Sequence, residues 1–180
     1  MFSTQKDETT YFAFSYPWSY EESQNQIDEI QTSFSNAEPE KKLYFHRETV
    51  YYSIEGRKME MMTISSTDGI SDERETIPEP GLFPEAVADP NRRPFVFPNK
   101  KVVFFTSRVH TGETPGSHVL NGAINLITDL KSEQGRLLRK NFVFKIIPTL
   151  NPDGVARGYY RLDTLGQNLN RFYQEPNRKE

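Results

Sequence analysis

Residues 101–115 read KVVFFTSRVHTGETP, an apolar run followed at once by the start of a helix. The apolar run predicts a buried strand. Thr114 and Pro115 at the end of the stretch suit the N-cap and the first position of a helix. His110 and Glu113 therefore fall on the turn between a strand and a helix. Open α/β sheets place ligands at the carboxyl ends of their strands, so this turn is a candidate binding site.

His110 and Glu113 have the residue types and the spacing of a metal site. A neutral imidazole and a carboxylate are both good zinc ligands, and residues three apart lie on the same side of a helical turn. The pattern also occurs by chance, as a surface histidine beside a glutamate that favours the first turn of a helix. Its position directly after a strand favours the metal site.

Apolar periodicity on both sides of this stretch predicts an α/β fold, in which a mixed β-sheet is covered by helices as an α/β/α sandwich. Strands are expected at 48–54, 58–65, 101–107 and 142–150, and helices at 21–34 and 115–130. Glu55 and Gly56 are expected to form a hairpin turn between the first two strands. The expected buried faces of the two helices consist of Ile27, Ile30 and Phe34, and of Val119, Leu120, Ala123, Ile124 and Ile127.

The segment 66–100 separates the hairpin from the next strand. It holds six of the twelve prolines and many acidic residues. It is expected to be a long irregular connection within one domain, because the sheet pattern resumes directly after it.

Composition narrows the class of protein. A chain of 180 residues with 35% hydrophobic and 13% aromatic residues can bury one core and is not disordered throughout. No apolar run approaches membrane-spanning length, and the polar start does not resemble a secretory signal. The absence of cysteine excludes disulfides and thiolate zinc ligands and fits the cytosol. No glycine-rich phosphate loop is present, and nothing indicates binding to nucleic acid or to a membrane.

The two halves of the chain differ in charge. Residues 101–180 carry 12 Lys and Arg against 7 Asp and Glu, a net charge of +5, whereas residues 1–100 carry 10 against 18, a net charge of −8. The half with the candidate site is therefore expected to attract acidic substrates. Taken one by one, most of these charged residues are expected to lie on solvent-exposed faces and at helix ends.

Two later motifs follow the His-x-x-Glu pattern in a specific order. They are NPDG at 151–154, after an apolar run, and NLNR at 168–171. The combination resembles the zinc metallocarboxypeptidases. Flanking words make the chain most similar to the cytosolic carboxypeptidases, and within them to the type-five branch: YFAFSYP at 11–17, YFHRE at 44–48, YSIEGR at 52–57, RPFVF at 93–97, SRVH at 107–110 and NPDGVARG at 151–158. The resemblance implies a lead-in at 1–10 and the N-terminal part of a catalytic domain at 11–180.

The resemblance also implies roles for individual residues. His110 and Glu113 match two of three zinc ligands, and Arg161 matches the arginine that stabilises the developing oxyanion. Asn170 and Arg171 match the pair that grips the terminal carboxylate of the substrate. This role suits them physically, because a guanidinium meets a carboxylate through two parallel hydrogen bonds. Residues 151–154 are expected to be structural, since their sequence is strong turn chemistry.

The chain departs from the family pattern in two respects. Thr111 stands where the family usually has proline. The third zinc ligand, a histidine of a later strand, and the catalytic glutamate have no match. The chain thus looks truncated within the catalytic domain and incomplete at its C-terminal side. The strand at 142–150 is accordingly expected to have an uncovered face or an unpaired edge.

The expected function is zinc-dependent removal of glutamate from polyglutamylated proteins such as tubulin, including branch-point glutamates, in a cytoplasmic protein associated with microtubules or cilia. One alternative is a non-catalytic homologue that binds acidic tails or partners without cutting them. A further alternative is a zinc-dependent deacylase on the same scaffold, which the NLNR motif disfavours.

Overall fold

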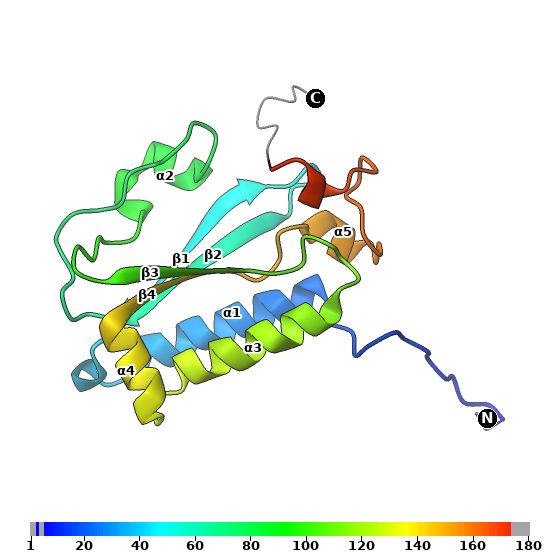
Figure 1. Ribbon diagram of the computed structural model, residues 1–180, viewed down its shortest axis with the longest axis horizontal. Helices are drawn as coiled ribbons and strands as arrows, with labels where there is room; N and C mark the ends of the chain where they lie inside the picture. The colour runs from blue at the N-terminus through cyan, green and yellow to red at the C-terminus, as the bar shows by residue number, and fades with distance from the viewer. Residues whose placement is uncertain (1–2, 4–5, 174–180) are drawn as a thin grey trace.

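The computed structural model describes residue 3 and residues 6–173. Its strands are β1 (Leu43–Tyr52), β2 (Lys58–Ser66), β3 (Lys101–Thr106) and β4 (Phe142–Ile147). The α-helices are α1 (Tyr20–Ser35), α2 (Pro84–Ala88), α3 (Thr114–Thr128), α4 (Glu133–Asn141) and α5 (Pro152–Ala156), and the short 3-10 turns are η1 (Pro39–Lys41), η2 (Pro90–Arg92) and η3 (Leu169–Arg171). Figure 1 shows one sheet with the long helices packed below it and an extended N-terminal segment leading away. No helix in the described part of the chain is long and apolar enough to cross a membrane.

The four strands form one mixed sheet in the order β1-β2-β4-β3. The hairpin β1–β2 and the pair β2–β4 are antiparallel, whereas β3 and β4 are parallel. The hairpin turn lies at the predicted place, with Gly56 at φ 77° and its N–H donating to the Ser53 carbonyl. The mixed sheet covered by helices is therefore confirmed.

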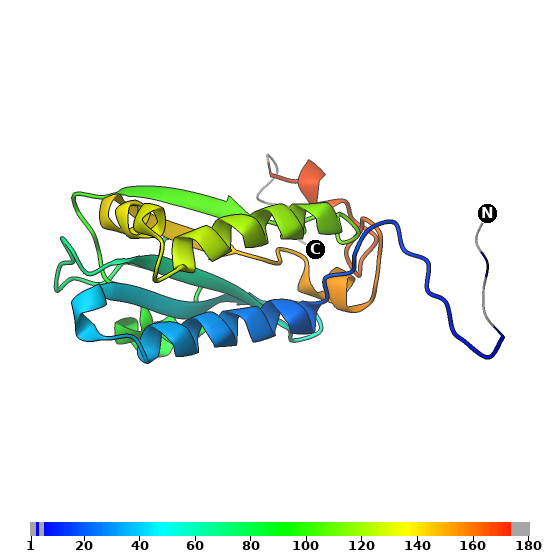
Figure 2. The same ribbon diagram turned by 90° about the horizontal axis from the view of Figure 1, so that it is seen from below.

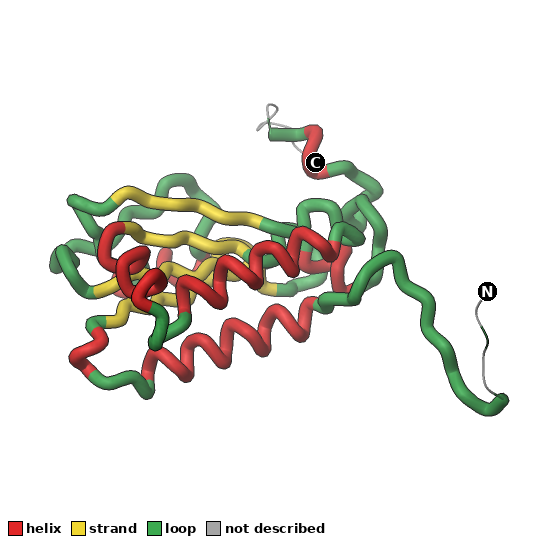
Figure 3. The backbone as a smooth tube through the Cα atoms, turned by 60° about the horizontal axis from the view of Figure 1, so that its bottom comes forward, coloured by secondary structure: helices red, strands yellow, loops and turns green. Residues whose placement is uncertain are grey.

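One face of the sheet carries the main core. Figures 2 and 3 show α1 and α3 side by side against this face. The amphipathic pattern dictates which sides of the helices are buried. The core consists of Ile27, Ile30 and Phe34 from α1, Leu120, Ile124 and Ile127 from α3, and Met62, Ile64, Phe144 and Ile146 from the sheet. Val119 was wrongly assigned to this core. It is 77% exposed, whereas Leu120, Ile124 and Ile127 are buried, so the buried stripe of α3 is narrower than predicted.

The opposite face of the sheet is covered by another part of the chain. Segment 66–100 lies across β1 and β2, and its only α-helix is the five-residue α2. Phe83 and Ala86 from this segment pack with Val50, Met61 and Ile147 of the sheet. The irregular connection is confirmed, and it acts as the second covering layer.

The strand at the open edge is also not the one predicted. β4 lies in the centre of the sheet, paired on both sides, because the chain crosses back between β2 and β3. The edge strands are β1 and β3, and Val102 and Phe104 of β3 are 57% and 58% exposed. The expectation of a buried strand at 101–107 was therefore wrong. The expectation of an uncovered face or an unpaired edge at 142–150 was also wrong, because β4 is paired on both sides and four of its six residues are buried.

Segment 66–100 is held to the sheet by a buried ionic network. Arg93 donates to Glu48 of β1 and, at 3.3 Å, to Glu75. Lys145 of β4 donates to Glu75 at 2.7 Å, and the Arg93 guanidinium stacks on the Phe83 ring. Glu48 is 7% exposed, and one of its oxygens has no partner within the described residues. Burial raises the pKa of Glu48 to about 7, against the lowering effect of Arg93 and Lys145.

The raised pKa of Glu48 gives a prediction about stability and pH. The stability that this group contributes is complete below its ordinary pKa of 4.5 and is lost as the pH rises through about 7. Glu48→Gln cannot ionise and removes the dependence. We therefore expect the unfolding free energy of wild type minus that of the variant to fall by about 3 kcal/mol between roughly pH 4.5 and pH 8. Urea unfolding at both pH values measures this, and a difference that rises with pH would contradict it.

Candidate functional site

The loop after β3 lies at the carboxyl end of the sheet, as predicted. Since β3 and β4 are parallel, their carboxyl ends meet at the same edge, and the loops that follow them are joined. Ser107 N–H donates to the Ile147 carbonyl at 3.1 Å, and Leu150 N–H donates to the Ser107 carbonyl at 2.9 Å. Asn151 N–H donates to the Arg108 carbonyl at 3.2 Å. These bonds bring His110 and NPDG to one end of the molecule.

Arg108 fixes the course of the loop that carries His110. Its backbone is in the left-handed region, at φ 60°, a conformation that costs a non-glycine residue energy and is common at functional sites. Its buried guanidinium donates to the Trp18 carbonyl at 2.7 Å and to the Thr111 carbonyl at 2.9 Å. Burial lowers the pKa of this guanidinium. The arginine therefore acts as an internal brace that ties the loop to the chain preceding α1.

The structure brings three of the five predicted site residues together. His110 is 5% exposed, and its Nδ1 lies 2.9 Å from Oε1 of Glu113. Nη1 of Arg161 lies 3.6 Å from the same Glu113 oxygen. The helix begins at Thr114, one residue earlier than predicted, so Glu113 itself is the N-cap and its side chain bonds no helix N–H. The carboxylate is consequently free to face His110.

Asn168 also contacts His110 and was not among the predicted site residues. Its Oδ1 lies 2.9 Å from Nε2 of the imidazole. Asn168 is the first residue of NLNR, and the resemblance assigned roles only to the third and fourth. The sequence feature that could have pointed to Asn168 is its place in that motif, two residues before the expected carboxylate clamp.

The loop carrying Arg161 packs against the His110 loop. Gly112 N–H donates to the Tyr160 carbonyl at 2.7 Å, and a Cβ at Gly112 would lie 2.7 Å from the Tyr160 ring. Only glycine therefore allows this approach. Thr111 is 2% exposed, and its hydroxyl donates to the Tyr159 carbonyl. Threonine in place of the family's proline thus adds a hydrogen bond between the two loops.

The NPDG motif is structural in the way predicted. Asn151 caps α5, accepting from the Gly154 N–H at 3.0 Å, and its amide donates to the Leu162 carbonyl at 3.3 Å. A Cβ at Gly154 would lie 2.5 Å from the Thr111 methyl, so this glycine permits close contact with the His110 loop. Asp153 is buried and accepts from Ser53 at 2.6 Å and Arg57 at 2.9 Å, which joins α5 to the hairpin.

The hydrogen bonds to Asp153 also determine its ionisation. Burial raises the pKa of this carboxyl, but the bonds from Ser53, Arg57 and the Glu55 N–H outweigh burial and leave the pKa below its ordinary value. Asp153 is therefore an ionised anchor between the hairpin and the site loops.

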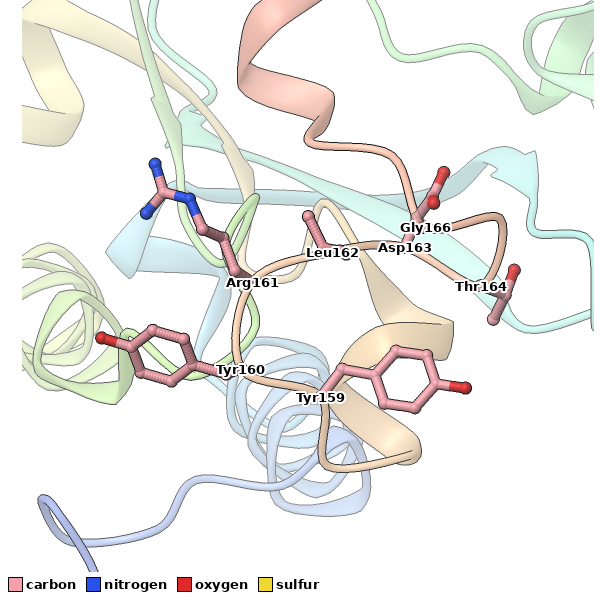
Figure 4. A pocket seen from close by; sticks show the side chains of 7 residues that line it. All are labelled: Tyr159, Tyr160, Arg161, Leu162, Asp163, Thr164 and Gly166. Atoms are coloured by element: carbon pink, nitrogen blue, oxygen red, sulfur yellow. The ribbon is translucent and has the colours of Figure 1, made fainter.

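An open pocket of about 650 Å³ lies beside Arg161. It is lined by Tyr159, Tyr160, Arg161, Leu162, Asp163, Thr164 and Gly166 (Figure 4). Figure 4 shows Tyr159 and Tyr160 pointing in opposite directions from the backbone. Asp163 accepts from the Gln167 N–H at 2.7 Å and so closes the turn that contributes Thr164 and Gly166 to the pocket lining. The pocket places polar and aromatic groups next to a fixed positive charge.

Asn170 and Arg171 are exposed on η3, directly after Asn168. The Arg171 guanidinium donates to the Asn170 carbonyl at 2.9 Å. Within the described residues it forms no ion pair. These two side chains thus lie on the same segment as Asn168, which contacts His110. Neither of them bonds to His110 or to Glu113. Their role as a carboxylate clamp stays a prediction.

The donor atoms fit two positions of a zinc site. When Nε2 of His110 carries the ring hydrogen and donates to Oδ1 of Asn168, 2.9 Å away, the lone pair on Nδ1 faces Oε1 of Glu113, also 2.9 Å away. These two acceptor atoms, Nδ1 of His110 and the Glu113 oxygen, repel each other unless a cation lies between them. Residue 3 and residues 6–173 contain no group of three or more His, Cys, Asp or Glu that would hold a metal. His118 is exposed, 3.2 Å from the Tyr16 carbonyl, and is not part of the cluster.

This incomplete donor set gives a prediction about metal affinity. We expect the 180-residue chain to bind zinc weakly, because catalytic zinc sites use three protein ligands and His110 and Glu113 supply two. Competition with a chromophoric zinc chelator measures the affinity. Sub-micromolar one-to-one binding that His110→Ala abolishes would contradict the prediction. His118→Ala then tests whether that histidine is the third ligand.

Comparison with known proteins identifies the family of the chain. A match to the zinc carboxypeptidase family covers residues 30–179. The chain is 44% identical over 173 residues to cytosolic carboxypeptidase-like protein 5 of Bos taurus, covering 93% of this chain and 19% of that protein. It is 33% identical over 172 residues to cytosolic carboxypeptidase 6 of Mus musculus, covering 96% of this chain and 26% of that protein. The chain therefore spans about a fifth to a quarter of the length of these relatives.

Solved structures show the same fold. A putative carboxypeptidase A of Shewanella denitrificans has a TM-score of 0.63 and 26% identity, with 89% of this chain and 32% of that chain covered. A metallo-carboxypeptidase of Burkholderia cenocepacia has a TM-score of 0.60 and 23% identity, with 89% and 33% covered. The family match over residues 30–179 and the identity to these relatives show that the chain belongs to the zinc carboxypeptidase family.

Proposed function

We propose that this chain is the N-terminal part of the catalytic domain of a zinc-dependent carboxypeptidase that removes glutamate from polyglutamylated proteins such as tubulin, including branch-point glutamates. The observation that carries the proposal is the contact of His110 with Glu113 beside Arg161. The sequence resemblance to cytosolic carboxypeptidases supports a cytoplasmic enzyme. Association with microtubules or cilia belongs to the same proposal.

The proposed chemistry divides among the residues of the cluster. His110 and Glu113 would hold the metal, which when bound polarises the scissile carbonyl and lowers the pKa of bound water to about 7. Arg161 carries a permanent positive charge 3.6 Å from Glu113 and would stabilise negative charge that develops on the carbonyl oxygen. Asn170 and Arg171 would bind the terminal carboxylate. An internal peptide bond has no such carboxylate, which accounts for cleavage at chain ends.

Charge supports an acidic substrate. The half of the chain that contains the site has a net charge of +5. Arg161 and Arg171 lie on the segment that follows NPDG, and Arg171 has no acidic partner within the described residues. A glutamate tail would be attracted to this surface and repelled by the acidic first half.

A second candidate is a non-catalytic protein that binds acidic tails without cutting them. The observation in its favour is the incomplete donor set, since the described residues supply two zinc ligands and no matched general base. The basic segment would remain available for binding.

The test measures cleavage and binding side by side. A peptide with a C-terminal glutamate tail is incubated with zinc and either the 180-residue chain or a full-length protein that carries it, and free glutamate is measured. We expect release by the full-length protein, loss of release in Glu113→Gln, and no release by the 180-residue chain. A peptide ending in glutamine is the matched neutral control.

The two remaining outcomes would each support a different conclusion. Zinc-dependent release by the 180-residue chain, sensitive to Glu113→Gln, would reveal a substitute base. If the full-length protein binds the glutamate tail but releases nothing, the binding protein is the correct reading.

A further inference from the structure

Three exposed lysines lie together at one end of the sheet. Lys101 is the first residue of β3 and stands opposite Phe142, the residue directly after α4. Lys131 precedes α4, and Lys140 lies in its last turn. None of the three lysines forms an ion pair within the described residues. Figure 1 shows α4 at the opposite end of the molecule from α5, so these lysines lie away from the candidate site.

The exposed face of α4 adds to this group of charges. Arg136 and Lys140 lie one turn apart, and like charges at this spacing repel each other. Glu133 bonds Arg136 at 2.6 Å and leaves Lys140 without a counter-charge. Leu137, between the two cations in sequence, is 45% exposed. The lysine surface is defined here by its five members, which are Lys101, Lys131, Arg136, Leu137 and Lys140.

The fold accounts for only part of this charge. The helix dipole favours cations at a C-terminus, which explains Lys140 in the last turn of α4. Lys131 lies at the N-terminal end of the same helix, where the dipole disfavours a cation, and Lys101 begins a strand. Asp129 accepts from the backbone N–H of Lys131 at 2.8 Å, not from its ammonium group. The ammonium groups of Lys101 and Lys131 bond no other group within the described residues, so they are available to a partner.

We propose that the lysine surface is a second binding surface of this protein and takes a glutamate-rich segment of an acidic partner polypeptide. The choice of partner rests on the proposed function, in which the substrate is an acidic protein. Charge complementarity supports it, because carboxylates spaced along an extended chain can face several ammonium groups in turn. Leu137 offers an apolar contact beside these charges. A polypeptide suits the surface better than RNA, whose unpaired bases stack on aromatic rings or guanidinium planes.

The position of the lysine surface predicts how it would act together with the candidate site. β3 has six residues and joins Lys101 at one end to the His110 loop at the other. A strand of this length spans about 20 Å, so the two surfaces bind different parts of the partner. A protein held at both points is bound more tightly than at either alone, because the second contact forms within the complex.

The experiment measures binding to the metal-free 180-residue chain by fluorescence anisotropy. The probe is a labelled peptide of about twelve glutamates, long enough to cover several lysines, with an amidated C-terminus. Amidation removes the terminal carboxylate that Arg171 is proposed to hold. We expect Lys101→Glu/Lys140→Glu to raise Kd by about tenfold at low salt, since two attractions become repulsions. Lys101→Arg/Lys140→Arg keeps both charges and should leave Kd close to that of wild type.

Lys6→Glu/Lys58→Glu is the matched control for net charge. Both lysines are exposed and lie outside the lysine surface, Lys6 in the N-terminal segment and Lys58 at the hairpin end of β2. This variant changes the net charge by the same amount and should leave Kd within about twofold of wild type. Circular dichroism shows whether each variant is folded, and the Arg variant tests the proposal even if the Glu variant does not fold.

Four results would overturn the proposal. An equal loss of affinity in the control variant would show that only net charge matters. Loss of binding in Arg171→Ala but not in Lys101→Glu/Lys140→Glu would place the peptide at the candidate site. Tighter binding of a single-stranded RNA, dependent on the same lysines, would make this a nucleic-acid surface. Self-association of the chain that Lys101→Glu/Lys140→Glu abolishes would make a second copy the partner. Neither zinc nor hydrolysis enters the measurement, so this inference and the proposed glutamate release can fail independently.

Discussion

Arg93→Leu is expected to lower the free energy of unfolding by about 3–5 kcal/mol, because it leaves a buried carboxylate without its partner. Arg93 and Glu48 are 3% and 7% exposed, and the guanidinium is the only cation that bonds Glu48 within the described residues. Lys145 bonds Glu75 instead. Loss of Arg93 also removes its stacking on Phe83, which holds segment 66–100 against the sheet.

Urea unfolding followed by circular dichroism measures this effect. The cost should be larger at about pH 8 than at about pH 6, since Glu48 can take up a proton at the lower pH and avoid the buried charge. The double variant Glu48→Met/Arg93→Met is the matched control. It removes both charges and should recover most of the loss. A single variant that costs less than about 1 kcal/mol, the range of exposed ion pairs, would show that the pair is effectively solvated.

Arg171→Ala in a full-length protein that carries this chain is expected to reduce kcat/KM for glutamate-tailed peptides by roughly thirty-fold or more. The proposed bond between Arg171 and the terminal carboxylate is charged and desolvated in the complex, and losing such a bond costs about 2–5 kcal/mol. Arg171→Lys should recover only part of the loss, because an ammonium cannot form two parallel hydrogen bonds to a carboxylate.

Arg157→Ala is the matched control for charge alone. Arg157 lies on the same basic segment, is half exposed and pairs with Glu55, not with the site. If kcat/KM falls equally in both variants, Arg171 attracts acidic substrates in general and is no clamp. A peptide with an amidated C-terminus gives the second check, since it should be insensitive to Arg171→Ala.

Periodicity and turn chemistry predicted the local structure well. The buried face of α1 was predicted from Ile27, Ile30 and Phe34, and the hairpin turn from Gly56, because these features depend on neighbours in sequence. The meeting of His110 and Glu113 was predicted for the same reason, since both lie on one short turn.

The errors concern relations between distant segments. An apolar run such as 101–107 has the same appearance in a central and in an edge strand, so the order of strands was not predictable from it. α4 was missed because its pattern is mostly polar, and its burial depends on Arg139, which donates to the Ile127 and Asp129 carbonyls at the end of α3. The contact of Asn168 with His110 joins residues 58 apart in the chain.

The central position of β4 has a consequence for how the chain folds. β1 and β2 pair locally. β2 forms its second ladder with β4, β3 pairs with β4 alone among the described strands, and β4 follows the other three in sequence. Until residues 142–147 leave the ribosome, β3 has no partner among the described strands and the hairpin is a two-stranded sheet, which is marginal in water. Assembly of the sheet therefore waits for one six-residue segment. Chains that end before it should be recognised by chaperones and proteases as unfolded, whatever their helices contribute.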